Sequence, residues 1–232
     1  MKKKKGKPKT KRIIEEKIPI PTQIADWAKE REKQLYVAAI IILILVGSGW
    51  WYKNYQKHKE WRAQKQYSII VSTYPTDNLT DKTKWQTPIK KLEAFLHEFK
   101  GTKTSLAAQL DLANAFYHVG SYGRAIDLYT ELLDQIDSNH PYWQLSQFGL
   151  AYCYEGKKDY TKAISILEKV KANPDTTMMA LVHYNLGRIY ELTGKKSKAL
   201  EEYKKYLEKE NFGIFKVLVE EKVKVLEHKT VS

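Results

Sequence analysis

The 18 residues from Leu35 to Tyr52, LYVAAIIILILVGSGWWY, contain no charged side chain, although 29% of all residues in the chain are charged. As a helix they would rise about 27 Å, close to the roughly 30 Å hydrocarbon thickness of a bilayer. The segment lacks the polar face of a helix at the edge of a soluble core. We predict a transmembrane helix at residues 35–52. Amphipathic rings at its ends are expected at the headgroup level, and these are Tyr36, Trp50, Trp51 and Tyr52.

A cleaved signal peptide is the main alternative for this segment. Signal peptides have a short charged region and end in a cleavage site of small residues. Here 34 residues precede the apolar run, and the sequence WWYKNYQ at its end has no such site. The pattern therefore favours a span that stays in the mature protein.

The formal net charge of +13 is concentrated around the apolar run. Residues 1–34 carry 12 Lys/Arg against 5 Asp/Glu, residues 53–70 carry 5 against 1, and residues 71–232 carry 23 against 21. Nucleic-acid binding calls for a basic patch on the folded domain, whereas basic residues beside a span attract anionic lipid headgroups. We predict a basic tail at 1–34, a basic juxtamembrane helical neck at 53–72, contact with membrane lipids and no nucleic-acid partner.

The orientation of the span depends on the Lys and Arg residues near it. The two flanks carry similar numbers close to the apolar run, so the cluster from Lys2 to Lys5 decides in favour of a cytoplasmic N-terminus. A long C-terminal domain can be translocated whatever its charge. We expect a single-pass protein of the inner membrane, with the tail in the cytoplasm and the C-terminal domain in the periplasm.

Three similar segments follow one another in the C-terminal part. Each has Leu, then a small residue, then an aromatic residue three positions later and Ala 12 positions after the small residue. The offsets between segments are 38 and 36 residues. The pattern resembles the tetratricopeptide repeat, two packed antiparallel helices with a period of about 34 residues. The segments are LANAFYHVGSYGRAI from Leu112, LAYCYEGKKDYTKAI from Leu150 and LGRIYELTGKKSKAL from Leu186.

The small residues are expected where the helices of a pair touch, and glycines 120, 156 and 194 in or near the turns. The earlier segment TPIKKLEAFLHEFKG is interpreted as half of a degenerate first repeat, and IFKVLVEEKVKVLEHK as a helix that covers the last repeat. The expected fold is all-α, with one transmembrane helix followed by a tetratricopeptide-like solenoid at residues 85–228. The predicted contact positions are Ala113, Ala125, Ala151, Ala163, Gly187 and Ala199.

The sequence offers no motif for catalysis or metal binding. Its six histidines are scattered, and neither H-E-x-x-H nor a Cys/His cluster is present. The fragment TGKKSKAL lacks the glycine spacing of a phosphate-binding loop. Cys153, the single cysteine, is interpreted as a small core residue. We therefore expect a protein that is not an enzyme, with no catalytic residue, cofactor, metal or small-molecule substrate.

A protein-binding surface remains as the expected functional feature. In repeats of this type the first helix of each pair lines the concave side, and aligning the three copies selects the residues there. An alternative is that the aromatic members only pack between repeats. Because few of these residues are cationic or amide side chains, we expect no clamp for a terminal carboxylate. The candidates are Asn114, Tyr117, Phe148, Tyr152, Glu155, Tyr184, Arg188 and Glu191, with Leu110 beside them.

Residues 35–228 resemble the YfgM-like family of bacterial inner-membrane proteins associated with the Sec translocon. The stretches GSGWWYKNYQKHKEWRAQKQY and TPIKKLEAFLHEFKGTKTSLAAQLDLANAFYHVGSYGRAI carry the resemblance. It implies a non-enzymatic adaptor whose partners are translocon subunits, periplasmic chaperones or exported chains. Two other hypotheses remain open: an envelope-assembly scaffold for cell division or secretion, and an accessory subunit of a membrane enzyme.

Overall fold

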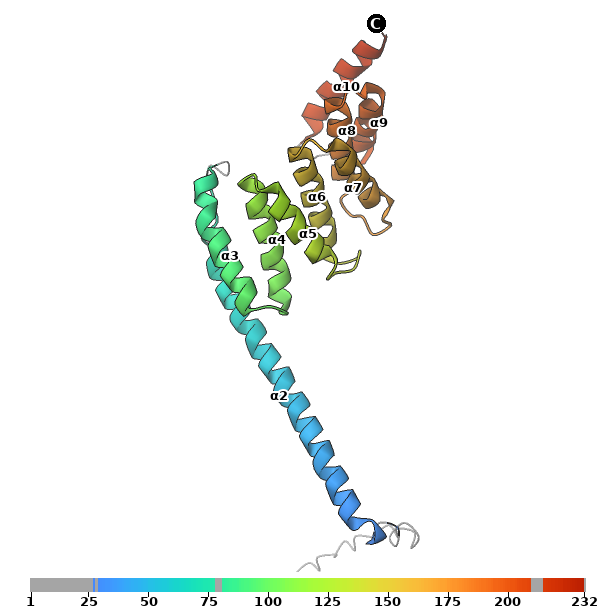
Figure 1. Ribbon diagram of the computed structural model, residues 1–232. Coiled ribbons are helices and arrows are strands. Elements are labelled where there is room, and N and C mark those ends of the chain that lie inside the picture. Colours follow the sequence, from blue (N-terminus) through green and yellow to red (C-terminus); the bar gives the residue numbers. More distant parts are fainter. Residues whose placement is uncertain (1–26, 28, 78–80, 210–214, 232) are drawn as a thin grey trace, which may run out of the picture. The chain divides into compact units, whose positions relative to one another are not determined.

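The computed structural model describes residue 27 and residues 29–77, 81–209 and 215–231. The predicted basic tail lies mostly outside these residues. Within them the chain is helical and contains no strand, so the all-α prediction is confirmed (Figure 1). The elements are α2 (Glu32–Val71), the short 3₁₀ helix η1 (Lys82–Trp85), α3 (Gln86–Glu98), α4 (Lys103–His118), α5 (Tyr122–Leu133), α6 (Pro141–Gly156), α7 (Tyr160–Ala172), α8 (Met179–Leu192), α9 (Lys196–Lys209) and α10 (Lys216–Val231).

The chain divides into two compact units, and the boundary falls inside α2, between Tyr55 and Gln56. The first unit contains the predicted span. There α2 is long and apolar enough to cross a membrane, judged by its length and composition. Its large apolar side chains are exposed, including Leu43 at 70% and Trp50 at 70%.

The second unit is a solenoid of helix pairs, and the repeat prediction is confirmed in its three copies. The pairs are α4 with α5, α6 with α7, and α8 with α9, and α10 packs on α9 (Figure 1). All six predicted contact positions are buried, because the helices of a pair cross where a larger side chain would keep them apart. The solenoid also buries rings and aliphatic side chains, and the largest fully buried ones are Tyr129 and Tyr203.

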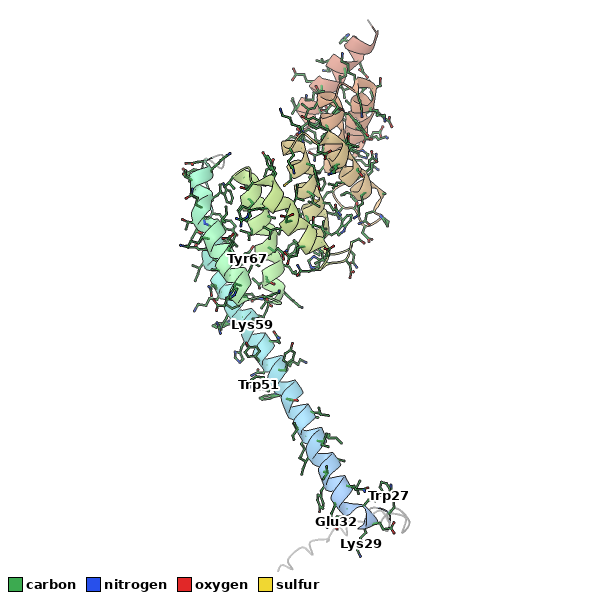
Figure 2. The ribbon with its side chains drawn as sticks, viewed as in Figure 1. Trp27, Lys29, Glu32, Trp51, Lys59 and Tyr67 are labelled. Atoms are coloured by element: carbon green, nitrogen blue, oxygen red, sulfur yellow. The ribbon has the colours of Figure 1, made fainter. Side chains whose placement is uncertain are left out.

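The last turns of α2 belong to this solenoid. Ala63 and Ile70 are buried with Leu92 and Phe95 of α3 in one apolar cluster. The hydroxyl of Tyr67 donates to Oδ2 of Asp111 in α4 at 2.5 Å, and Figure 2 labels this tyrosine on α2. Residues 56–71, expected as a neck, therefore supply the helix that packs beside α3, and the compact unit begins at Gln56, well before residue 85.

The three glycines lie in or near the turns of the pairs, as expected, but only two of them occupy the equivalent turn position. Gly120 and Gly194 adopt positive φ angles of 81° and 74°, as glycine readily does. In the second pair this position is occupied by Lys158, with φ of 61°. Gly156 instead ends α6, where an added Cβ would lie 2.5 Å from Cζ of Tyr122. It permits close approach of a ring, and the strained turn position is two residues further on.

We expect Lys158→Gly to stabilise the repeat unit by about 0.5–1 kcal/mol. A left-handed backbone costs a residue with a side chain roughly 1–2 kcal/mol, and the greater freedom of glycine in the unfolded chain offsets part of the gain. Lys157→Gly is the control. Lys157 has a φ of −83°, which does not favour glycine, and glycine has a lower helix propensity than lysine, so this variant should be destabilised. Chemical denaturation of both variants checks the prediction, which is wrong if Lys158→Gly destabilises the protein as Lys157→Gly does.

Candidate functional site

A groove of about 320 Å³ opens between α4, α6 and the segment that starts α8. We call it the α4–α6 groove. Four of the eight predicted partner-binding residues line it, and so does Leu110. The complete lining is Leu110, Asn114, Tyr117, His118, Tyr129, Leu145, Phe148, Gly149, Tyr152, Met178 and Leu181.

Local sequence places these side chains on one wall. Thr102 caps α4 by accepting a hydrogen bond from the Ser105 amide, and the α6 N-terminus is fixed by the His140 cap and Pro141 in its first turn. Residues that lie three, four or seven positions apart on a helix share one face. Both helices therefore present a stripe of apolar and aromatic side chains to the groove.

The groove floor depends on a contact between a tyrosine and a glycine. The ring of Tyr129 in α5 lies against Gly149 of α6, where an added Cβ would be 2.2 Å from its Cζ atom. The Tyr129 hydroxyl donates to Oδ1 of Asn114 at 2.5 Å. Asn114 is thereby held by an internal partner, which fixes the direction of its amide in the groove wall.

The groove walls are aromatic and uncharged at neutral pH. The ring of Tyr152 lies 6.3 Å from Tyr117 and 6.4 Å from Phe148, centroid to centroid. Burial raises the pKa of both tyrosines, so their hydroxyls stay protonated. His118 stacks on Trp85 at 4.5 Å, and burial lowers the pKa of its imidazole. No carboxylate or ammonium group is among the lining residues, so the groove is suited to an uncharged, apolar ligand.

The other predicted site residues are engaged with side chains of neighbouring elements. Arg188 forms two hydrogen bonds with the Glu155 carboxylate, one of them at 2.7 Å, and so connects α8 to α6. Tyr184 stacks on Phe215 at 4.3 Å. Glu191 accepts hydrogen bonds from the Tyr203 hydroxyl and the Lys222 ammonium. These four side chains line no part of the α4–α6 groove.

The exposure of two α6 side chains in the groove differs from the sequence-based prediction. Phe148 was expected on an exposed wall, but only 3% of its surface is accessible. Leu145 is 42% exposed at the groove edge and was not among the candidates. It lies one turn before Phe148 on the same stripe of α6, so extending the alignment by one turn would have selected it. Met178 and Leu181 come from a loop and a helix start that the repeat pattern does not define.

A buried polar cluster lies away from the groove. His183 Nδ1 is 2.6 Å from Oε2 of Glu202, and Lys171 donates to both Glu202 and Glu168. Burial acts to raise the pKa of Glu202. Its hydrogen bond with His183 and its attraction to Lys171 together lower the pKa by more, so the pKa lies below its usual value. The acid is therefore ionised and paired, which is typical of a structural cluster.

The remaining reactive groups give no catalytic arrangement. Burial raises the pKa of the Cys153 thiol to about 12, which keeps it protonated. In the part of the chain that the structure describes, no group of three His, Cys, Asp or Glu side chains is placed to hold a metal ion.

The paired helices and the groove on their first helices define a tetratricopeptide-like solenoid. The chain belongs to the tetratricopeptide repeat-like domain family, whose model matches residues 26–228. This fold is typical of non-enzymatic scaffolds that bind other proteins, and the family is not a catalytic one.

Solved structures share the fold at low sequence identity. One is the crystal structure of a point variant of a putative kinesin light chain from Podosopora anserina, with nearly identical TPR-like repeats. Its sequence is 18% identical to this chain. The TM-score is 0.56, and the match covers 74% of this chain and 87% of that chain. A second structure of these repeats is 17% identical, with a TM-score of 0.51 over 73% and 96%. No curated protein matches the sequence.

Proposed function

We propose that the protein is a membrane-anchored scaffold that captures uncharged, apolar segments of partner proteins in the α4–α6 groove. The observation that carries this proposal is a groove whose lining residues include exposed Leu145 and half-buried tyrosines but no charged side chain. Aromatic and aliphatic side chains in a concave surface are the usual anchors of a protein interface. Tyr117, Leu145 and Tyr152 are the proposed contacts, with Asn114 as a polar rim.

The anchor in this proposal is the first part of α2. Residues 35–52 are uncharged and long enough to span a bilayer as a helix. The rings of Tyr36, Trp50, Trp51 and Tyr52 would then lie at the two membrane interfaces. Lipids are thus proposed to contact the first unit, and protein partners the second.

The resemblance of residues 35–228 to the YfgM-like family supports a place near the Sec translocon. Chains emerging in the periplasm expose apolar segments before they fold, and such segments match the chemistry of the groove. In this proposal the protein holds them next to the translocon and passes them to periplasmic chaperones. The partners are translocon subunits, chaperones and exported chains.

Site-specific photo-crosslinking tests this function in native membranes. A photoreactive amino acid at Leu145 should trap exported chains, translocon subunits or chaperones, which mass spectrometry identifies. The matched control is Leu192, an exposed leucine at the end of α8 and outside the groove. Adducts with cell-division or secretion components at Leu145 would instead support an envelope-assembly scaffold. Equal adducts at both positions would contradict binding in the groove.

We expect Leu145→Ser to weaken partner capture without unfolding the domain. Removing an exposed leucine side chain that a partner buries costs about 1–2 kcal/mol, or roughly a 5- to 30-fold loss of affinity. Stability should change little, since substitutions at exposed positions usually stay within about 0.5 kcal/mol. Leu192→Ser is the control. The prediction is checked by pull-down and melting curves on the same samples, and equal capture by both variants contradicts it.

We also expect the second unit to face the periplasm. Protease added to spheroplasts should digest residues 71–232 and leave the N-terminal tail intact, because the tail would lie behind the membrane. Detergent lysis, which should expose the tail, is the control. Protection of residues 71–232 in intact spheroplasts would reverse the orientation.

A further inference from the structure

One end of the second unit carries a group of basic side chains from two distant parts of the sequence. The Lys59 ammonium donates to the Lys100 carbonyl at 2.8 Å, and the Lys103 amide donates to Glu60 at 2.7 Å. The turn between α3 and α4 is therefore held against the part of α2 where Figure 2 labels Lys59. We call this surface the basic end, and its members are Lys57, Lys59, Trp61, Lys100 and Lys103.

The acidic residues at the basic end are already used inside the protein. Glu60 accepts hydrogen bonds from two backbone amides and the Thr104 hydroxyl at the start of α4. Glu98 pairs with Arg62 at 2.7 Å. Among the residues that the structure describes, none of the four lysines of the basic end forms an ion pair with a carboxylate. The basic end therefore has an excess of positive charge.

Trp61 adds an apolar group to this charge. Its indole is 60% exposed, and the Lys65 ammonium lies 5.7 Å from the ring centroid. Exposed indoles beside lysines are characteristic of protein surfaces at the headgroup level, where one part of the ring is buried and another is wet. Anionic headgroups at a membrane surface would engage both the lysines and the indole.

Part of the basic end follows closely on the apolar run in the sequence. Lys57 follows Tyr52 by five residues, and Lys59 follows it by seven. Even fully extended, seven residues span at most about 25 Å, and as a helix about 10 Å. The hydrogen bond from Lys59 to the Lys100 carbonyl holds the α3–α4 turn beside this part of α2.

We propose that the basic end binds anionic phospholipid headgroups through its lysines, with the Trp61 indole inserted between them. This inference rests on the proposed membrane span. It assigns a lipid-binding role to Lys100 and Lys103, which lie more than 45 residues after the apolar run and are not part of the basic flank. The α3–α4 turn is thus a second point of membrane contact for the repeat unit.

Amine acylation in defined vesicles tests the proposal with the full chain. The protein is reconstituted in phosphatidylcholine alone or mixed with phosphatidylglycerol, flotation confirms insertion, and a membrane-impermeant reagent labels exposed lysines for mass spectrometry. Phosphatidylglycerol should slow the labelling of Lys100 and Lys103 about fivefold, since one basic residue near an anionic surface gains that order of attraction. Lys90 and Lys91, exposed elsewhere on α3, are internal controls. High salt should remove the difference.

A charge reversal separates the turn from the flank. In Lys100→Glu, protection of Lys103 by phosphatidylglycerol should fall toward the phosphatidylcholine value, while Lys90→Glu should keep it. If Lys103 stays fully protected in the first variant, or if Lys100 and Lys103 of the wild-type protein label equally in both vesicles after flotation, the basic end serves another partner and the proposal is overturned. Failure of the wild-type protein to float would overturn the span and this inference together.

Discussion

Two arginines in the apolar run, Ile42→Arg and Leu43→Arg, are expected to abolish stable membrane insertion. Each charged residue at the centre of a span costs about 2.5–3.5 kcal/mol, so the pair costs roughly 5–7 kcal/mol. Both side chains are exposed, at 59% and 70%, so the described protein offers no acidic partner around them. The wild-type chain should resist carbonate extraction, and the double variant should appear in the soluble fraction.

The control for this prediction exchanges the same two residues as Ile42→Leu and Leu43→Ile, which keeps the hydropathy. The melting curve of the repeat unit should be the same in all three proteins, because both substitutions lie in the first unit. Mass spectrometry of the mature wild-type protein should also find residues 35–52. Carbonate release of the wild-type protein, or loss of these residues from it, would mean that the segment is a signal sequence and not an anchor.

Gly149→Ala is expected to destabilise the repeat unit by about 1–3 kcal/mol and to deform the α4–α6 groove. The new Cβ would lie 2.2 Å from Cζ and 2.6 Å from the hydroxyl of Tyr129, so the ring must move. Overpacking costs about 1–3 kcal/mol, and loss of the hydrogen bond to Asn114 adds about 1 kcal/mol. The higher helix propensity of alanine, about 1 kcal/mol, offsets part of this.

The control has the opposite expected sign. Gly123 in α5 has no neighbouring atom within 4 Å of an added Cβ, so Gly123→Ala should be neutral or slightly stabilising. In a Tyr129→Ala background the cost of Gly149→Ala should disappear, giving a coupling energy of about 1–3 kcal/mol. Denaturant unfolding of the four proteins in the cycle measures it. Equal effects of Gly149→Ala with and without the Tyr129 ring would show that this contact does not shape the groove.

The sequence by itself determined the features that depend on local pattern. The repeat is readable because each pair must bring small residues together every 36–38 positions, as at Ala113 and Ala151, whatever the rest of the solenoid does. The apolar run is equally readable, since uncharged length is a property of composition. The stripe of Asn114, Phe148 and Tyr152 also followed from alignment, because helical period decides which side chains share a face.

Only the tertiary structure decided which of the aligned side chains meet. Arg188 and Glu155 align as surface residues, yet they bind each other, and Tyr184 is covered by Phe215. Residues 53–72 read as a basic neck, but Ala63 and Ile70 within them pack with Leu92 and Phe95 of α3 across a gap in sequence. These outcomes depend on the distance between helices and on partners 20 to 40 residues away. Periodicity places a side chain on a face of its helix, and packing decides what lies opposite it.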